Sequence, residues 1–195
     1  MSSGNGLAGG LRVLIANEEA ERLAQLAPAI AGIGHVAIAR DIDAADVATV
    51  TLADRPDVAL VKIGAEADAA LAIIAKIVRE AVFPALALVE PNDADGIAAA
   101  ARSGVFAYLV DTSRDELRSA IEIALKRFAE FHNLQDAFER RALIEQSKGI
   151  LMARHGLDAD HAFAMLRDHS QHGGKKLFEV AEAIVDSHLL LVPPA

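Results

Sequence analysis

The chain has 195 residues, of which 53% are hydrophobic, 24% are charged and none is cysteine. The apolar fraction excludes an intrinsically disordered chain, and the lack of cysteine excludes disulfides and thiolate metal sites. With 28 acidic and 19 basic side chains the net charge is −9, so a nucleic-acid site would have to be a local patch. Residues 1–10 are rich in Gly and Ser without signal-peptide features, and no apolar run could span a membrane. We therefore expect a flexible N-terminus and a cytoplasmic protein.

Residues 11–115 alternate short aliphatic runs with amphipathic segments. The runs predict strands at 12–16, 35–39, 57–61, 85–89 and 106–110. The intervening segments predict helices at about 19–31, 44–53, 67–80 and 94–103, with a further helix from 113. This order is typical of βαβ units, and it predicts an α/β fold with a flavodoxin-like, doubly wound, five-stranded parallel sheet. Ligands of such sheets bind at the carboxyl ends of the strands.

The second part of the chain follows a helical pattern. Residues 115–155 carry an a/d seam with alternating spacings of four and three. Its members are Leu117, Ile121, Ala124, Phe128, Phe131, Gln135, Phe138 and Ala142. We predict that residues 116–140 form a coiled-coil linker of a homodimer in which Gln135 fixes the register. The alternative is that the Phe side chains pack on the chain's own core. Helices at about 158–170 and from 177 would complete a small three-helix domain over residues 138–195.

A set of motifs at fixed spacing lies in this last domain. They are Ile144-Glu145-Gln146-Ser147-Lys148-Gly149-Ile150-Leu151-Met152, His155-Gly156, Asp160-x-Ala162-Phe163-x-x-Leu166-Arg167 and Val180-Ala181. Together they resemble the ANTAR domain, a three-helix RNA-binding module of bacterial transcription antiterminators. The resemblance implies binding to paired stem-loops in a nascent leader RNA, where unstacked loop bases are accessible to side chains. A dimer would present two such modules.

The resemblance also suggests which side chains contact RNA. The candidates are Lys148, Arg154, Arg167, Lys175 and Lys176. Arg140 and Arg141 could add to the positive electrostatic field that the RNA meets as it approaches. Each of them could instead be an ordinary solvated charge. Phe163 and Phe178 could stack on bases or belong to the core. The histidines do not follow a metal-ligand spacing, so we expect neither a metal nor a cofactor.

The whole chain resembles two-component response regulators of the receiver–ANTAR type. Receivers use two acids, an acceptor Asp, a hydroxyl residue and a Lys-Pro pair. In this chain the corresponding positions are Asn17 and Glu18, Lys62, Val89 and Asp111. A lysine cannot form an acyl phosphate, so the resemblance predicts a degenerate receiver pocket. Lys62 and Asp111 could form an ion pair in this pocket, or both could be solvated loop residues.

The sequence thus predicts a non-enzymatic RNA-binding antitermination regulator, controlled by a protein partner, a ligand or its oligomeric state. One alternative is an interaction scaffold that has lost RNA affinity, because residues 133–195 carry seven basic and nine acidic side chains. Another is a regulator that is phosphorylated on a different acid, such as Glu66 or Asp68.

Overall fold

The computed structural model describes residues 10–17, 20–64, 67–91, 93–110 and 112–191. They form two compact units, residues 1–130 (the α/β unit) and residues 131–195 (the helical unit). Among the described residues, no helix is both long and apolar enough to cross a membrane.

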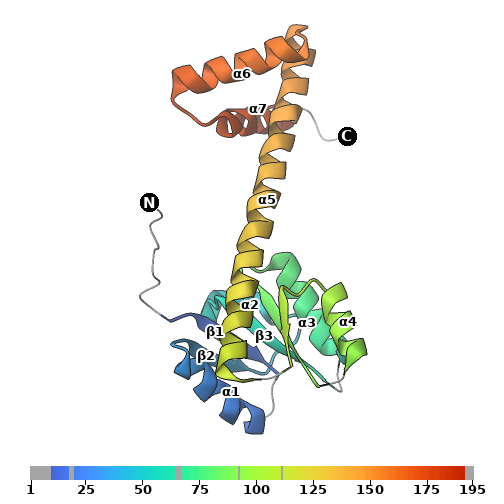
Figure 1. Ribbon diagram of the computed structural model, residues 1–195. Coiled ribbons are helices and arrows are strands. Elements are labelled where there is room, and N and C mark those ends of the chain that lie inside the picture. Colours follow the sequence, from blue (N-terminus) through green and yellow to red (C-terminus); the bar gives the residue numbers. More distant parts are fainter. Residues whose placement is uncertain (1–9, 18–19, 65–66, 92, 111, 192–195) are drawn as a thin grey trace. The chain divides into compact units, whose positions relative to one another are not determined.

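The α/β unit is built on a parallel sheet of five strands. The strands are β1 (Arg12–Ala16), β2 (Val36–Arg40), β3 (Val58–Ile63), β4 (Ala85–Val89) and β5 (Ala107–Leu109). Their order is β2-β1-β3-β4-β5 (Figure 1). Strand β2 is thus added on one side of β1, and β3, β4 and β5 are added on the other side. This is the flavodoxin-like order, and it confirms the predicted doubly wound sheet.

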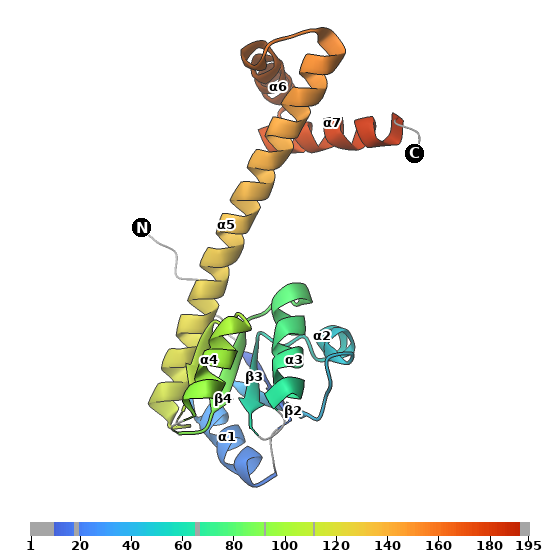
Figure 2. The same ribbon diagram turned by 90° about the vertical axis from the view of Figure 1, so that its right-hand side faces the viewer.

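Helices cover both faces of this sheet (Figures 1 and 2). They are α1 (Ala20–Gly32), α2 (Val47–Asp54), α3 (Ala67–Glu80), α4 (Ala94–Arg102) and the first part of α5 (Arg114–His155). Alternate strand residues point to opposite faces. Val13 and Ile15 pack with α1 and α5, whereas Leu14 and Ala16 lie in the core formed with α2, α3 and α4. Both faces are therefore apolar, which explains why the strands are nearly continuous aliphatic runs.

The first turns of α5 belong to the core of the α/β unit. Leu117, Ile121 and Ala124 are at most 3% exposed and pack with the sheet and α1. Phe128 meets the ring of Phe106 edge to face, with 5.3 Å between centroids. The first residues of the seam predicted for a dimer are thus buried within one copy of the chain. Ile121 in particular is not accessible to a second copy, because its side chain is already buried.

The helical unit contains the rest of α5, α6 (Ala159–Gly173) and α7 (Leu177–Leu191). Each helix contributes to a small core of Leu151, Ala162, Leu166 and Val180. Ser147 on α5 is fully buried, and its hydroxyl donates a hydrogen bond to the Ile144 carbonyl (2.8 Å). The polar atom is thus satisfied within its own helix.

The bounds of β3 and α2 differ from the predicted ones. Strand β3 continues to Ile63, so Lys62 lies within the strand and pairs in register with Leu88 of β4. Helix α2 begins at Val47 rather than near residue 44. The Asp43 carboxylate accepts the backbone N–H groups of Ala45 (2.6 Å) and Asp46 (3.2 Å), which forms a turn before the helix.

Candidate functional site

Asn17 lies at the carboxyl end of β1, where receivers carry an acid. Its side-chain nitrogen donates to the Ile42 carbonyl and its side-chain oxygen accepts the Ile42 N–H, both at 2.7 Å. Its backbone adopts a left-handed conformation with φ of 56°, which asparagine tolerates better than most residues. The amide therefore holds the segment after β2 against the end of β1.

Lys62, the residue predicted to take the place of the phosphoacceptor, lies within β3. Its side chain is 16% exposed, and Nζ lies 4.0 Å from Oε1 of Glu90, the residue that follows β4. Val89, predicted to take the place of the hydroxyl residue, is 1% exposed within the sheet. Glu18, Asp111 and Glu66 lie outside the described residues, so the Lys62–Asp111 pair stays a prediction. The geometry instead brings a second acid, Glu90, close to Lys62.

The candidate RNA contacts lie on α5, on α6 and in the turn between α6 and α7. Arg154 in the last turn of α5, Arg167 on α6, and Lys175 and Lys176 between α6 and α7 are exposed. Lys148 is different because its side chain is only 17% exposed and pairs with Glu145 on the same helix at 2.9 Å. A phosphate would have to displace that carboxylate from Lys148.

Two cations meet at one aromatic ring in this unit. The Arg140 guanidinium carbon lies 5.9 Å from the centroid of the Phe178 ring, and Lys176 Nζ lies 5.8 Å from it. Both distances are within cation–π range. Arg140 is on α5 and Phe178 is on α7, so the two residues are far apart in the sequence and their contact could not be predicted from a local pattern. The fold thus adds Arg140 to the basic residues of the α6–α7 turn.

The α6–α7 turn itself is held by hydrogen bonds. The Ser170 hydroxyl donates to the Lys175 carbonyl (2.7 Å), and the Lys175 N–H donates to the Ser170 carbonyl (3.2 Å). Gly174 ends α6 in the left-handed conformation with φ of 60°, which suits glycine. The backbone that carries Lys175 and Lys176 is therefore fixed by the turn.

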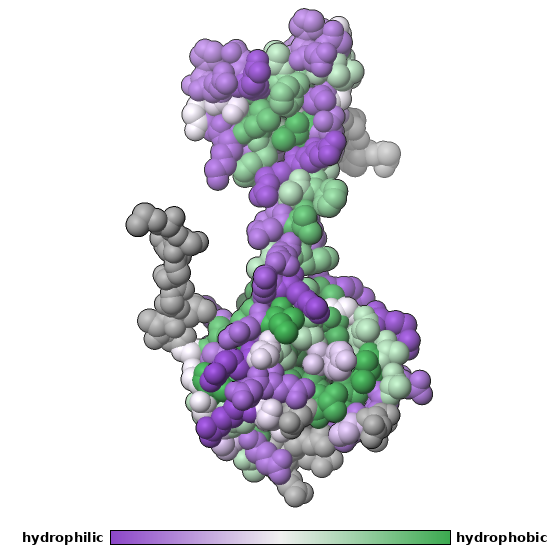
Figure 3. Space-filling view, in the orientation of Figure 1, coloured by the Kyte–Doolittle hydropathy of each residue, from purple (hydrophilic) through white to green (hydrophobic). Residues whose placement is uncertain are grey.

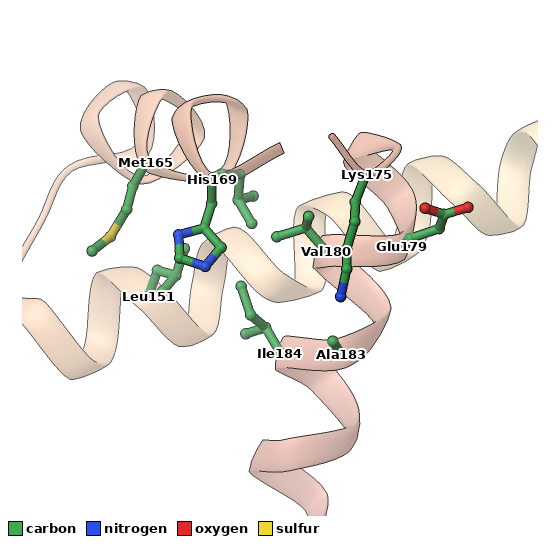
Figure 4. A pocket seen from close by; sticks show the side chains of 9 residues that line it. Leu151, Met165, His169, Lys175, Glu179, Val180, Ala183 and Ile184 are labelled. Atoms are coloured by element: carbon green, nitrogen blue, oxygen red, sulfur yellow. The ribbon is translucent and has the colours of Figure 1, made fainter. Parts of the chain in front are cut away.

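A pocket of about 320 Å³ opens beside this turn (Figure 4). Its lining residues are Leu151, Met165, Leu166, His169, Lys175, Glu179, Val180, Ala183 and Ile184. In the space-filling view of Figure 3, an apolar area lies between α6 and α7 and is bordered by hydrophilic residues. The sequence did not predict the pocket, because its walls come from three helices. In the sequence, its apolar residues look the same as residues of a hydrophobic core.

The middle of α5 carries exposed apolar side chains. Phe131, Leu134 and Phe138 are 52%, 63% and 73% exposed and recur on one side of the helix. Gln135 lies next to them and its side chain donates to Glu139 on the same helix (3.3 Å). This group, Phe131, Leu134 and Phe138, is called the α5 stripe below.

Comparison with known proteins agrees with these two parts. Residues 132–185 match the ANTAR domain family. Over 184 residues, the chain is 26% identical to the transcriptional regulatory protein PdtaR of Mycobacterium tuberculosis, covering 90% of each protein.

The α/β unit also resembles solved receiver domains. One is the signal receiver domain of a modulated diguanylate cyclase from Desulfovibrio desulfuricans, with a TM-score of 0.52 and 22% identity over 62% of this chain and 97% of that one. Another is the receiver domain of an HD domain-containing protein from Pseudomonas fluorescens, with a TM-score of 0.52 and 17% identity over 62% and 98% of the two chains. These likenesses show the fold. The chain therefore combines a receiver-like α/β domain with an ANTAR domain at residues 132–185.

Proposed function

We propose that this protein is a non-enzymatic, cytoplasmic transcription antitermination regulator whose ANTAR domain binds RNA stem-loops in nascent leader transcripts. The observation that carries the proposal is the ANTAR match over residues 132–185, which present exposed basic side chains on α5, on α6 and in the α6–α7 turn. Since residues 133–195 are slightly acidic overall, binding must depend on where the basic residues lie rather than on net charge.

The α6–α7 turn is the centre of the proposed RNA-binding surface. Lys175 and Lys176 are exposed on a fixed backbone, and Arg140 reaches the same aromatic ring as Lys176. Arg154 on α5 and Arg167 on α6 extend the surface. Lys148 contributes after its ion pair with Glu145 opens.

The receiver-like domain is proposed to act without aspartyl phosphorylation. Lys62 cannot form an acyl phosphate, and Val89 offers no hydroxyl to a phosphoryl group. Both polar atoms of the Asn17 amide are engaged with Ile42, which leaves this side chain poorly suited to hold Mg²⁺. A protein partner, a small ligand or the oligomeric state would then control the domain.

The α5 stripe is proposed to bind the same stripe of a second copy. Phe138 and Leu134 are the most exposed of its side chains, and helices in proteins gain most of their stability from packing of such a face. A dimer would bury the stripe and place two ANTAR domains on one RNA, which raises the effective concentration of the second.

The proposal is tested with RNA that carries two adjacent stem-loops with randomised loop sequences. The wild-type protein is used to select binders, and the affinity of one selected RNA is measured by fluorescence anisotropy at several salt concentrations. We expect affinity to fall steeply with salt. Replacing Lys175 and Lys176 with Glu should weaken binding by about tenfold or more, since two phosphate contacts are reversed.

The matched control replaces Arg118 and Lys126 with Glu. Both are exposed on the part of α5 that belongs to the α/β unit, so the charge change is identical and RNA affinity should be nearly preserved. Failure of the wild-type protein to enrich any RNA, even at low salt, would favour the interaction-scaffold alternative.

A further inference from the structure

We propose that the pocket between α6 and α7 takes up one unpaired nucleotide of the bound RNA loop, with the base inside and its phosphate at Lys175. This inference rests on the proposed RNA-binding function and adds a base-binding site to it. It goes beyond the basic side chains, which would hold any RNA through its phosphates.

The walls of the pocket suit a flat heterocycle. Leu166 of α6, Val180 of α7 and Leu151 of α5 all line it and are buried. Its volume of about 320 Å³ is at the small end of ligand pockets, which begin near 300 Å³. Met165 is 43% exposed on one wall although it is large and apolar. A base inserted here would cover this side chain and the faces of Val180 and Ile184.

The polar groups of the pocket could bind a nucleotide, whereas an apolar helix would offer them no partner. In Figure 4 the His169 ring and the Lys175 ammonium both point into the space between α6 and α7. The Glu179 carboxylate points away from the ring and accepts the Lys176 backbone N–H (2.9 Å), so the start of α7 sets its position. The imidazole can hydrogen-bond a base edge, and the ammonium suits the adjoining phosphate.

Loop bases supply the matching chemistry. An unpaired base exposes both faces to water, and its burial against side chains is a main source of sequence-tolerant affinity. The pocket is also next to Lys176, which extends the same turn, so one loop could contact the pocket and the basic turn together. An apolar protein segment would leave His169 and Lys175 without matching charge.

The first experiment fills the pocket. Ala183 lines it and is exposed, so Ala183→Leu adds apolar volume without disturbing the buried core. Ala164 is an exposed alanine on α6 that does not line the pocket, so Ala164→Leu is the matched control. With the selected RNA, we expect Ala183→Leu to weaken binding by about tenfold, the size of losing one stacked base. Ala164→Leu should change binding by less than about twofold.

The second experiment uses the wild-type chain. The sequence has three methionines, Met1, Met152 and Met165, so a protein labelled with ¹³C at the methionine methyl groups gives a simple NMR spectrum. A base in the pocket should shift the Met165 methyl signal by its ring current. Met152 packs with the core of the helical unit and does not line the pocket, so its signal should move less.

The outcomes separate this inference from the function on which it rests. If wild-type protein binds RNA but Ala183→Leu binds equally well and the Met165 signal does not move, the pocket inference is overturned and RNA binding stands. If wild-type protein binds no RNA, both proposals fail. A change in molecular mass of Ala183→Leu by light scattering would make the pocket a protein interface. A Met165 shift with free nucleoside monophosphates at equal affinity would exclude the RNA loop as its specific ligand.

Discussion

The side-chain amide of Asn17 makes hydrogen bonds in both directions with the main chain of Ile42. Nδ2 donates to the Ile42 carbonyl and Oδ1 accepts the Ile42 N–H, at 2.7 Å each. A carboxylate could accept the second bond but could not donate the first. The surroundings of Asn17 thus suit an amide rather than an acid.

Asn17→Asp should therefore destabilise the α/β domain. The new carboxylate would face the Ile42 carbonyl, and we expect a loss of about 1–3 kcal/mol in the free energy of unfolding. Urea unfolding followed by circular dichroism measures it. Asn133→Asp, at an exposed position of α5, makes the same chemical change and should cost little. Equal stabilities of the two variants would contradict the role given to the amide.

Incubation with acetyl phosphate and Mg²⁺ should leave the intact mass of the protein unchanged. The reason is that Lys62 cannot accept a phosphoryl group as an acyl phosphate, and Val89 cannot bind one through a hydroxyl. Mass spectrometry reads the result, with a receiver domain that has an intact acceptor treated in parallel. A mass gain that disappears in Asp68→Asn would instead support the alternative acid on α3.

Phe138→Glu should shift the protein from dimer to monomer. The side chain is 73% exposed, so the change leaves the fold of one copy intact but places two carboxylates in the proposed apolar seam. Analytical ultracentrifugation measures the mass. Asn133→Glu adds the same charge on another face of α5, about 100° or more around the helix from each residue of the stripe, and should preserve the dimer. A wild-type protein that is monomeric at all concentrations would refute the proposed dimer.

Two glycine-to-alanine changes should have opposite effects on stability. The Asp93 carboxylate caps α4 by accepting the Gly96 N–H (2.8 Å), and a Cβ on Gly96 would overlap that carboxylate. Gly96→Ala should therefore cost about 0.5–2 kcal/mol, as the loss of a cap does. Gly149 lies within α5, and beyond its own helix backbone no described atom lies within 4 Å of the Cβ that alanine would add. Gly149→Ala should stabilise by about 0.5–1 kcal/mol in chemical unfolding.

Acid should weaken α6 through its cap, Asp158. The His161 backbone N–H and ring both hydrogen-bond the carboxylate (2.8 Å each), and they hold the pKa of Asp158 below its ordinary value. A depressed pKa adds stability above the unfolded value, near 4, and that stability is lost as the pH falls through the folded pKa. Asp158→Asn keeps a capping oxygen, so its melting temperature should depend less on pH between about 6 and 3. Parallel acid profiles for both proteins would argue against this role.

The sequence predicted the architecture well because the signal was local. Aliphatic runs marked the strands, and the helical segment at Ala67–Glu80 was placed at its observed ends. The five-stranded sheet and the C-terminal helices are confirmed. The start of α2 was wrong by three residues, since the pattern does not reveal that Asp43 takes the N–H groups that would begin the helix.

Whether an apolar helix face is buried depends on what packs against it, and the periodicity of the sequence does not carry this information. The same spacing places Ile121 against its own sheet and Phe138 in solvent, although both belong to one predicted seam. The contact of Arg140 with Phe178 and the α6–α7 pocket join residues far apart in sequence. The neighbour of Lys62, Glu90, was likewise not predicted, because it follows a different strand.

Helix α5 belongs to both units, so the protein cannot be divided cleanly at either end of this helix. Its first turns supply Leu117 and Ala124 to the α/β core, and its last turns supply Leu151 to the core of the helical unit. A C-terminal fragment that includes all of α5 would expose the apolar face of its first turns. An N-terminal fragment that ends before Arg114 would expose the face of the sheet that α5 covers. Recombinant halves should therefore be cut near Glu130, where the described side chains contribute to neither core.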